Sequence, residues 1–119
     1  MRVIDLSTDG PGGGRVQQLE GRGCEAGVSI IFTSTAEPGA GPYLHKHPYA
    51  ETFVIHAGRA LFTVGDEELV GSAGQVLVVP GFTPHKFAVI GPERFWSTNV
   101  HANDTFVTEW LEGPEATLL

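Results

Sequence analysis

Short apolar segments separated by glycine, proline, aspartate or asparagine follow one another along most of the chain. Each is rich in β-branched and aromatic residues, which favours strands, and no stretch of about eleven or more residues shows a helical period. The pattern predicts an all-β fold, and Gly65-Asp66 predicts a hairpin turn. The expected strands lie within residues 28–32, 53–55, 60–64, 76–79, 87–90, 95–100 and 106–111.

Two of these segments are apolar at every position. A strand with one wet face alternates between apolar and polar residues, whereas residues 53–55 and 76–79 do not. Both of their faces are therefore expected to be covered. Because a chain of 119 residues has little material for a second layer, a second copy of the chain is the expected cover. The sequence thus predicts a homodimer.

The length fits a single domain over residues 1–119, in which residues 1–20 form an N-terminal arm or strand. Seven Lys and Arg residues against 14 Asp and Glu residues give a charge of −7, which argues against nucleic acid and anionic membranes as partners. The sequence shows neither an apolar run of about twenty residues nor a secretory signal. We therefore expect a cytoplasmic protein, and the lone Cys24, which cannot form an internal disulfide, fits a reducing compartment.

The candidate chemistry lies between Tyr43 and His85. Residues two apart on a strand face the same side, so His45 and His47 project together, and Glu51 can join them if the intervening turn brings the next strand alongside. His85, after a second predicted turn, can supply a fourth ligand from a neighbouring strand. Imidazole nitrogens with one carboxylate oxygen suit Fe, Mn, Ni, Cu or Zn.

The glycines and prolines around these residues resemble both motifs of the cupin superfamily. The first motif reads G-x5-H-x-H-x3,4-E-x6-G, and the chain matches it at Gly39, His45, His47, Glu51 and Gly58. The second reads G-x5-P-x-G-x2-H-x3-N, and the chain matches it at Gly74, Pro80 and His85.

The second motif departs at two positions, where Phe82 replaces Gly and Val89 replaces Asn. Gly81 is expected to supply the turn in a shifted form. The resemblance implies a double-stranded β-helix, or jelly-roll, barrel. It also implies that one divalent transition metal ion is bound by His45, His47, Glu51 and His85.

Two further residues are candidates for catalysis. His101 follows Ser97 and Asn99 at a spacing of two residues and can line the cavity, the alternative being a solvated histidine at a strand end. Tyr43 shares the parity of His45 and can reach the mouth of the site, the alternative being a barrel-filling tyrosine. His56 has the parity opposite to Glu51 and is expected on the outer face.

The residues that share parity with the predicted ligands are apolar, and they are expected to form the cavity wall. They are Phe53, Ile55, Phe87 and Val89. Such a wall favours a small, largely apolar or aromatic ligand with one or two metal-binding oxygens over a phosphorylated sugar.

An open coordination position distinguishes a reacting metal from a structural one. The leading hypothesis is a metal-dependent enzyme that acts on a small organic molecule, with a dioxygenase-like oxidoreductase favoured. The alternative is a non-catalytic module that binds or senses a small molecule, because the fold alone does not select a chemistry.

Overall fold

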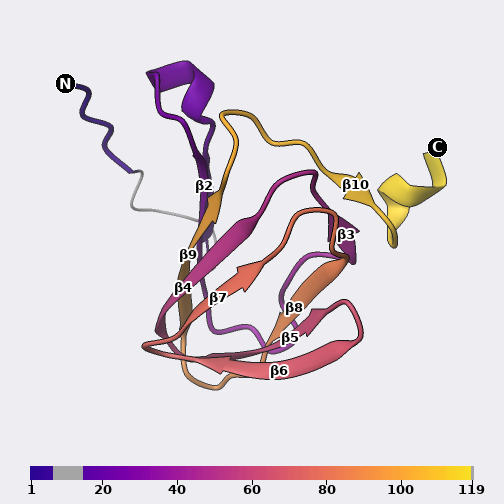
Figure 1. Cartoon of the computed structure of the whole chain (residues 1–119). Helices are drawn as coiled ribbons and strands as arrows, with labels where there is room; N and C mark the ends of the chain where they lie inside the picture. The colour runs from indigo at the N-terminus through magenta and orange to yellow at the C-terminus, as the bar shows by residue number, and fades with distance from the viewer. Residues whose placement is uncertain (7–14, 119) are drawn as a thin grey trace.

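The computed structural model describes residues 1–6 and 15–118, and two antiparallel sheets facing each other make up most of it (Figure 1). One sheet has the strand order β1-β2-β9-β4-β7, and the other has the order β10-β3-β8-β5-β6. Two short 3-10 helices, η2 (Gly21–Cys24) and η3 (Pro114–Leu118), lie outside the sheets. The predicted all-β jelly-roll barrel is confirmed. Within the described ranges no helix has the length and apolar character needed to cross a membrane.

The strand bounds follow the predicted segments closely in the middle of the chain. The first sheet contains β1 (Arg15–Leu19), β2 (Ser29–Thr35), β9 (Phe95–His101), β4 (Glu51–Ala57) and β7 (Val76–Val79). The second contains β10 (Glu109–Trp110), β3 (His45–Lys46), β8 (His85–Val89), β5 (Arg59–Val64) and β6 (Glu67–Ser72).

The sequence prediction differs from the structure near both ends. Residues 3–6 form no strand, whereas β1 pairs with β2 along its whole length and was not predicted as a separate strand. The segment 106–111 contains only the two-residue strand β10. The glycine-rich residues 10–14 of the predicted arm lie outside the described ranges.

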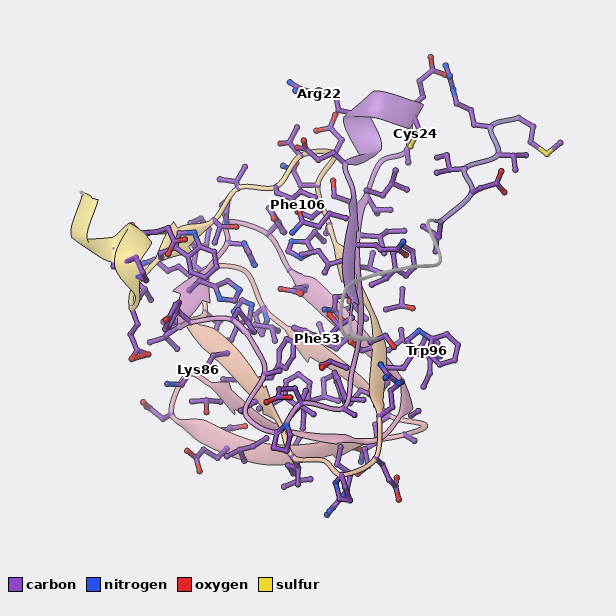
Figure 2. The ribbon with its side chains drawn as sticks, turned by 180° about the vertical axis from the view of Figure 1, so that it is seen from behind. Arg22, Cys24, Phe53, Lys86, Trp96 and Phe106 are labelled. Atoms are coloured by element: carbon purple, nitrogen blue, oxygen red, sulfur yellow. The ribbon has the colours of Figure 1, made fainter. Side chains whose placement is uncertain are left out.

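A strict alternation on the central strands fills the space between the sheets. On β4, Phe53 and Ile55 are buried while Val54 and Thr52 are only partly buried. Figure 2 shows Phe53 between the sheets and Trp96 on the outer side of β9. The packed core consists of Phe53, Ile55, Ala60, Phe62, Val79, Phe87, Val89 and Phe95.

Toward one end of the barrel the inward side chains change from apolar to polar. Along β4 the order is Ile55, Phe53 and then Glu51, and along β8 it is Val89, Phe87 and then His85. All six are buried. The apolar half supports the barrel, and the polar half forms a site at its end.

Two turns bear on the predictions. The hairpin at Gly65-Asp66 is confirmed, because Val64 pairs directly with Glu67 across it. The shifted turn at Gly81 is wrong: Phe82 itself adopts the positive φ, 63°, at the motif position where a glycine is expected. The backbone of the motif is therefore retained without its glycine.

Candidate metal centre

Two facing rows of cross-strand neighbours bring the predicted ligands together. In the second sheet His45 pairs with His85, and in the first sheet Glu51 pairs with His101. Directly opposed residues on antiparallel strands hold their side chains close together, so each row presents its polar groups at one level of the barrel. His47, just beyond β3, adds a third imidazole, and one ligand atom from each of His45, His47, Glu51 and His85 lies within 4.8 Å of the others.

Backbone carbonyls fix the tautomer of these three histidines. The Nδ1–H groups of His45, His47 and His85 donate to the carbonyls of Tyr43, Val107 and Thr83, respectively, at 2.7, 2.8 and 2.8 Å. A carbonyl can only accept, so in the neutral ring the proton resides on Nδ1 and the lone pair on Nε2. This is the hydrogen-bond pattern that orients metal-binding histidines.

Two of these Nε2 atoms, those of His47 and His85, face the same carboxylate oxygen. Oε1 of Glu51 lies 3.0 Å from Nε2 of His85 and 3.2 Å from Nε2 of His47. Lone pairs that face a carboxylate repel it unless a cation lies between them. Metal bonds to nitrogen and oxygen of about 2.0–2.2 Å at right angles separate neighbouring ligands by about 3 Å, as observed here. These residues therefore fit a bound transition metal and can hold it.

The protonation states agree with this donor set. Burial lowers the pKa of His45 to about 4, against the opposing hydrogen bond to the Tyr43 carbonyl, and the nearby His85 and His47 add to the decrease. A neutral imidazole is the form of histidine that binds a metal.

A cavity of about 500 Å³ opens beside this cluster. Predicted wall residues Phe53 and Phe87 line it, whereas Ile55 and Val89 belong to the packed core instead, so their expected place in the wall is wrong. Further apolar walls come from residues that parity did not assign, namely Ile31, Ala40, Pro42, Phe106 and Trp110. Among the described residues that line the cavity, none is Arg or Lys.

The two catalytic candidates have different surroundings. Tyr43 is 55% exposed, and within the described residues its backbone carbonyl, not its ring, contacts the cluster. His101 is 2% exposed, lines the cavity and lies with Nε2 3.3 Å from Oε2 of Glu51. His56 lies on the outer face as expected, where it contacts Thr98.

Sequence reasoning missed Tyr49 and Val107. The Tyr49 ring stacks on His47 with centroids 4.9 Å apart, and its hydroxyl contacts Nδ1 of His101 at 2.8 Å. Burial raises the pKa of this tyrosine. Val107 contributes only backbone groups, because its N–H donates to the Tyr49 hydroxyl and its carbonyl accepts from His47. A side-chain pattern carries no signal for such backbone contacts.

The fold and the site together define a class of protein. It is a small jelly-roll barrel with a buried cluster of three histidines and one carboxylate that can hold a metal ion. The family model for the cupin domain matches residues 25–96, which is more than half of the chain. The chain belongs to the cupin family. A search of curated proteins found no match.

Solved structures with the same fold include enzymes that act on oxalate. Oxalate decarboxylase from Lactobacillus farciminis, in a formate complex, has a TM-score of 0.72 and 24% identity over 82% of this chain and 31% of its own. An oxalate oxidase bound to the substrate analogue glycolate has a TM-score of 0.70 and 20% identity over 91% of this chain and 60% of its own.

A structure of Bacillus subtilis oxalate decarboxylase, studied for its Mn(II) centres, has a TM-score of 0.74 and 24% identity over 88% of this chain and 31% of its own. The present chain therefore spans about a third of each decarboxylase chain. At these identities the likeness establishes the fold.

Proposed function

We propose that the protein is a metal-dependent cupin enzyme, with His45, His47, Glu51 and His85 as ligands of one divalent transition metal ion, and that it oxidises a small organic molecule as a dioxygenase does. The observation that carries the proposal is the position of the ligand cluster, which borders a cavity of about 500 Å³. Four protein ligands leave two positions of a six-coordinate ion for other groups.

The cavity wall supports an aromatic or enolic substrate. Phe53, Phe87 and Phe106 provide apolar surface that excludes water from a bound ligand. Since no Arg or Lys is among the described lining residues, a dianion such as oxalate or a sugar phosphate lacks a cationic side chain to bind it. A substrate with one or two oxygens at the metal and an apolar body matches this wall better.

When bound, a redox-active divalent ion supplies Lewis acidity and electron transfer with dioxygen. The chain's own residues hold the substrate against the phenylalanine wall. A dioxygenation consumes one O2 and incorporates both of its atoms, so it needs no external reductant. We also propose that residues 1–119 form a single domain, since Phe106 and Trp110 beyond the matched segment line the same cavity as Phe53 and Phe87.

Metal analysis of the freshly purified protein tests the ligand assignment. We expect about one ion per chain in the wild type. In His47→Ala and Glu51→Ala we expect the affinity for the metal to fall by roughly tenfold to a hundredfold or more, because a ligand is lost. The matched control is His56→Ala, which removes an exposed histidine from the same barrel and is expected to keep full occupancy. Full occupancy in the His47→Ala, Glu51→Ala double variant contradicts the assignment.

Oxygen uptake tests the reaction. The metal-loaded protein is offered catechol, a 1,3-diketone and oxalate in separate reactions, and we expect uptake with the first or second compound and none with oxalate. Uptake must disappear in Glu51→Ala and persist in His56→Ala. Catechol binding without oxygen consumption favours the non-catalytic binding module, and turnover of oxalate alone contradicts the substrate class.

A further inference from the structure

His101 differs from the other histidines of the site in what its ring nitrogens contact. Of the buried side-chain nitrogens and oxygens in the described part of the chain, only Nε2 of His101 has no hydrogen-bond partner. It lies 3.3 Å from Oε2 of Glu51 without hydrogen-bonding geometry. A buried polar atom without a partner is costly, so an unpaired nitrogen beside a cavity points to a ligand as its missing partner.

The neighbour of its other nitrogen assigns the tautomer. His45, His47 and His85 each face a carbonyl through Nδ1, whereas Nδ1 of His101 faces the Tyr49 hydroxyl at 2.8 Å. That hydroxyl accepts the Val107 N–H at 3.3 Å, and we infer that it donates its own proton to Nδ1 of His101. With Nδ1 accepting this proton, the neutral His101 ring carries its hydrogen on Nε2.

The two tautomers have opposite uses. The three predicted ligands present lone pairs, which bind a cation, while His101 presents an N–H, which cannot bind a metal but can donate to an oxygen. The Phe106 ring packs edge-on against His101 with centroids 5.0 Å apart, and the His47 ring lies 4.7 Å away, so the imidazole is held from two sides. An N–H donor held in place between the cluster and the cavity favours a bound molecule that has an oxygen acceptor near Nε2 of His101.

Asn99, another polar residue that lines the cavity, already has hydrogen-bond partners. Asn99, two residues earlier on the same inward face, accepts from the Ser97 hydroxyl at 2.7 Å and contacts Thr33 through its amide nitrogen at 3.5 Å. These three side chains satisfy one another within the barrel, so they do not compete with His101 for a bound molecule.

We propose that His101 is a ligand-binding residue whose Nε2–H donates to a phenolate, enolate or carboxylate oxygen of the small molecule held in the cavity, and that Tyr49 is a positioning residue which fixes this tautomer. The proposal deepens the proposed function and rests on it for the identity of the site. His101 lies outside residues 25–96, so the match to the family model does not extend to this position.

The first experiment measures catechol binding to the zinc-loaded protein by calorimetry. His101→Met keeps a similar volume and removes the donor, and we expect catechol affinity to fall by roughly tenfold or more. His101→Gln keeps an N–H near the same point and is expected to recover part of the loss. Tyr49→Phe keeps the ring on His47 but removes the hydroxyl, and a loss of roughly threefold is expected. Zinc content is expected to remain at the wild-type level in all three.

The second experiment reads the tautomers by nitrogen-correlated NMR of the imidazole rings, with and without zinc. We expect hydrogen on Nε2 for His101 and on Nδ1 for His45, His47 and His85, and we expect Tyr49→Phe to mix the two forms at His101 alone. Hydrogen on Nδ1 of His101, loss of zinc in His101→Met, or unchanged catechol affinity in every variant overturns the proposal. If wild-type protein binds no metal, the proposed function fails, whereas the tautomer measurement on the metal-free protein still tests the role of Tyr49.

Discussion

Phe82 adopts a backbone conformation that side chains with a Cβ rarely take. Its φ is 63°, its side chain is 69% exposed, and its N–H donates to the carbonyl of the predicted ligand His47 with an N···O distance of 2.6 Å. A left-handed conformation costs a residue other than glycine about 1–2 kcal/mol. The turn beside the cluster therefore keeps its hydrogen bond to His47 at the expense of local strain.

Replacing Phe82 tests this strain directly. We expect Phe82→Gly to be more stable than Phe82→Ala by about 1 kcal/mol in urea unfolding, because both variants remove the exposed ring but only glycine adopts positive φ without strain. At an unstrained position the order is reversed, since glycine loses more backbone entropy than alanine. A more stable alanine variant would show that the turn is not strained.

The predicted ligands could be found from the sequence because strand parity and motif spacing act on the side chains themselves. The structure brings all three predicted histidine ligands, His45, His47 and His85, to Glu51. The role of Tyr49 could not be found in the same way. Its hydroxyl reaches a histidine 52 positions further along the chain, and no local pattern encodes that contact.

At the scale of the elements, β2 contributes one wall of the cavity. Ile31 and Thr33 line it, and Phe32 between them faces the other side of the sheet, where it borders an outer pocket. Because successive side chains of a strand point to opposite faces, substitutions at neighbouring positions of β2 change different surfaces.

A matched pair on β2 tests the cavity. Ile31→Phe adds a ring on the cavity side, and we expect it to weaken catechol binding to the zinc-loaded protein by roughly tenfold while zinc content stays the same, because it fills space without touching the cluster. Ile30→Phe adds the same ring at the opposite parity and is expected to bind catechol like the wild type. Equal loss in both variants would indicate a general disturbance of β2, and no loss in either would mean that ligands do not use this wall.

The elements that the sequence did not predict owe their form to tertiary contacts. Three of the five residues of β1 are Arg or Gln, so its segment carries little strand signal, and it forms a strand by pairing with β2. The apolar segment 106–111 looks like a strand, yet the N–H and carbonyl of Val107 are used by the side chains of Tyr49 and His47. Backbone groups occupied in this way cannot join a ladder.

At the scale of the whole molecule, the outer face of the first sheet carries exposed apolar side chains. Val76 and Val78 on β7 are 60% and 62% exposed, and Trp96 on β9 is 49% exposed. Within the described sheet, β7 is an edge strand with a neighbour on one side only. We expected both faces of residues 76–79 to be covered, but the described part of one chain leaves the outer face exposed. Uncovered apolar edges favour association with a second copy.

Light scattering tests the dimer. At micromolar concentration we expect twice the chain mass of 12.7 kDa for the wild type and the single-chain mass for Val78→Asp, because a buried unpaired charge opposes association. Leu69→Asp is the control, since Leu69 is 52% exposed on β6 of the other sheet and is expected to leave the dimer intact. A wild-type monomer would contradict the prediction.

The peptide unit at Val107 has a kinetic consequence. It holds His47 through one backbone group and Tyr49 through the other, yet residues 102–108 belong to no strand or helix. Irregular segments open more easily than the ladders around them. Each opening frees the His47 ring to turn, so the lifetime of a bound ion is expected to follow the opening rate of this segment rather than the strength of the metal bonds. Zinc transfer to a chelator should then reach a rate that no longer rises with chelator concentration, and Val107→Pro, which lacks the N–H, should raise that limiting rate.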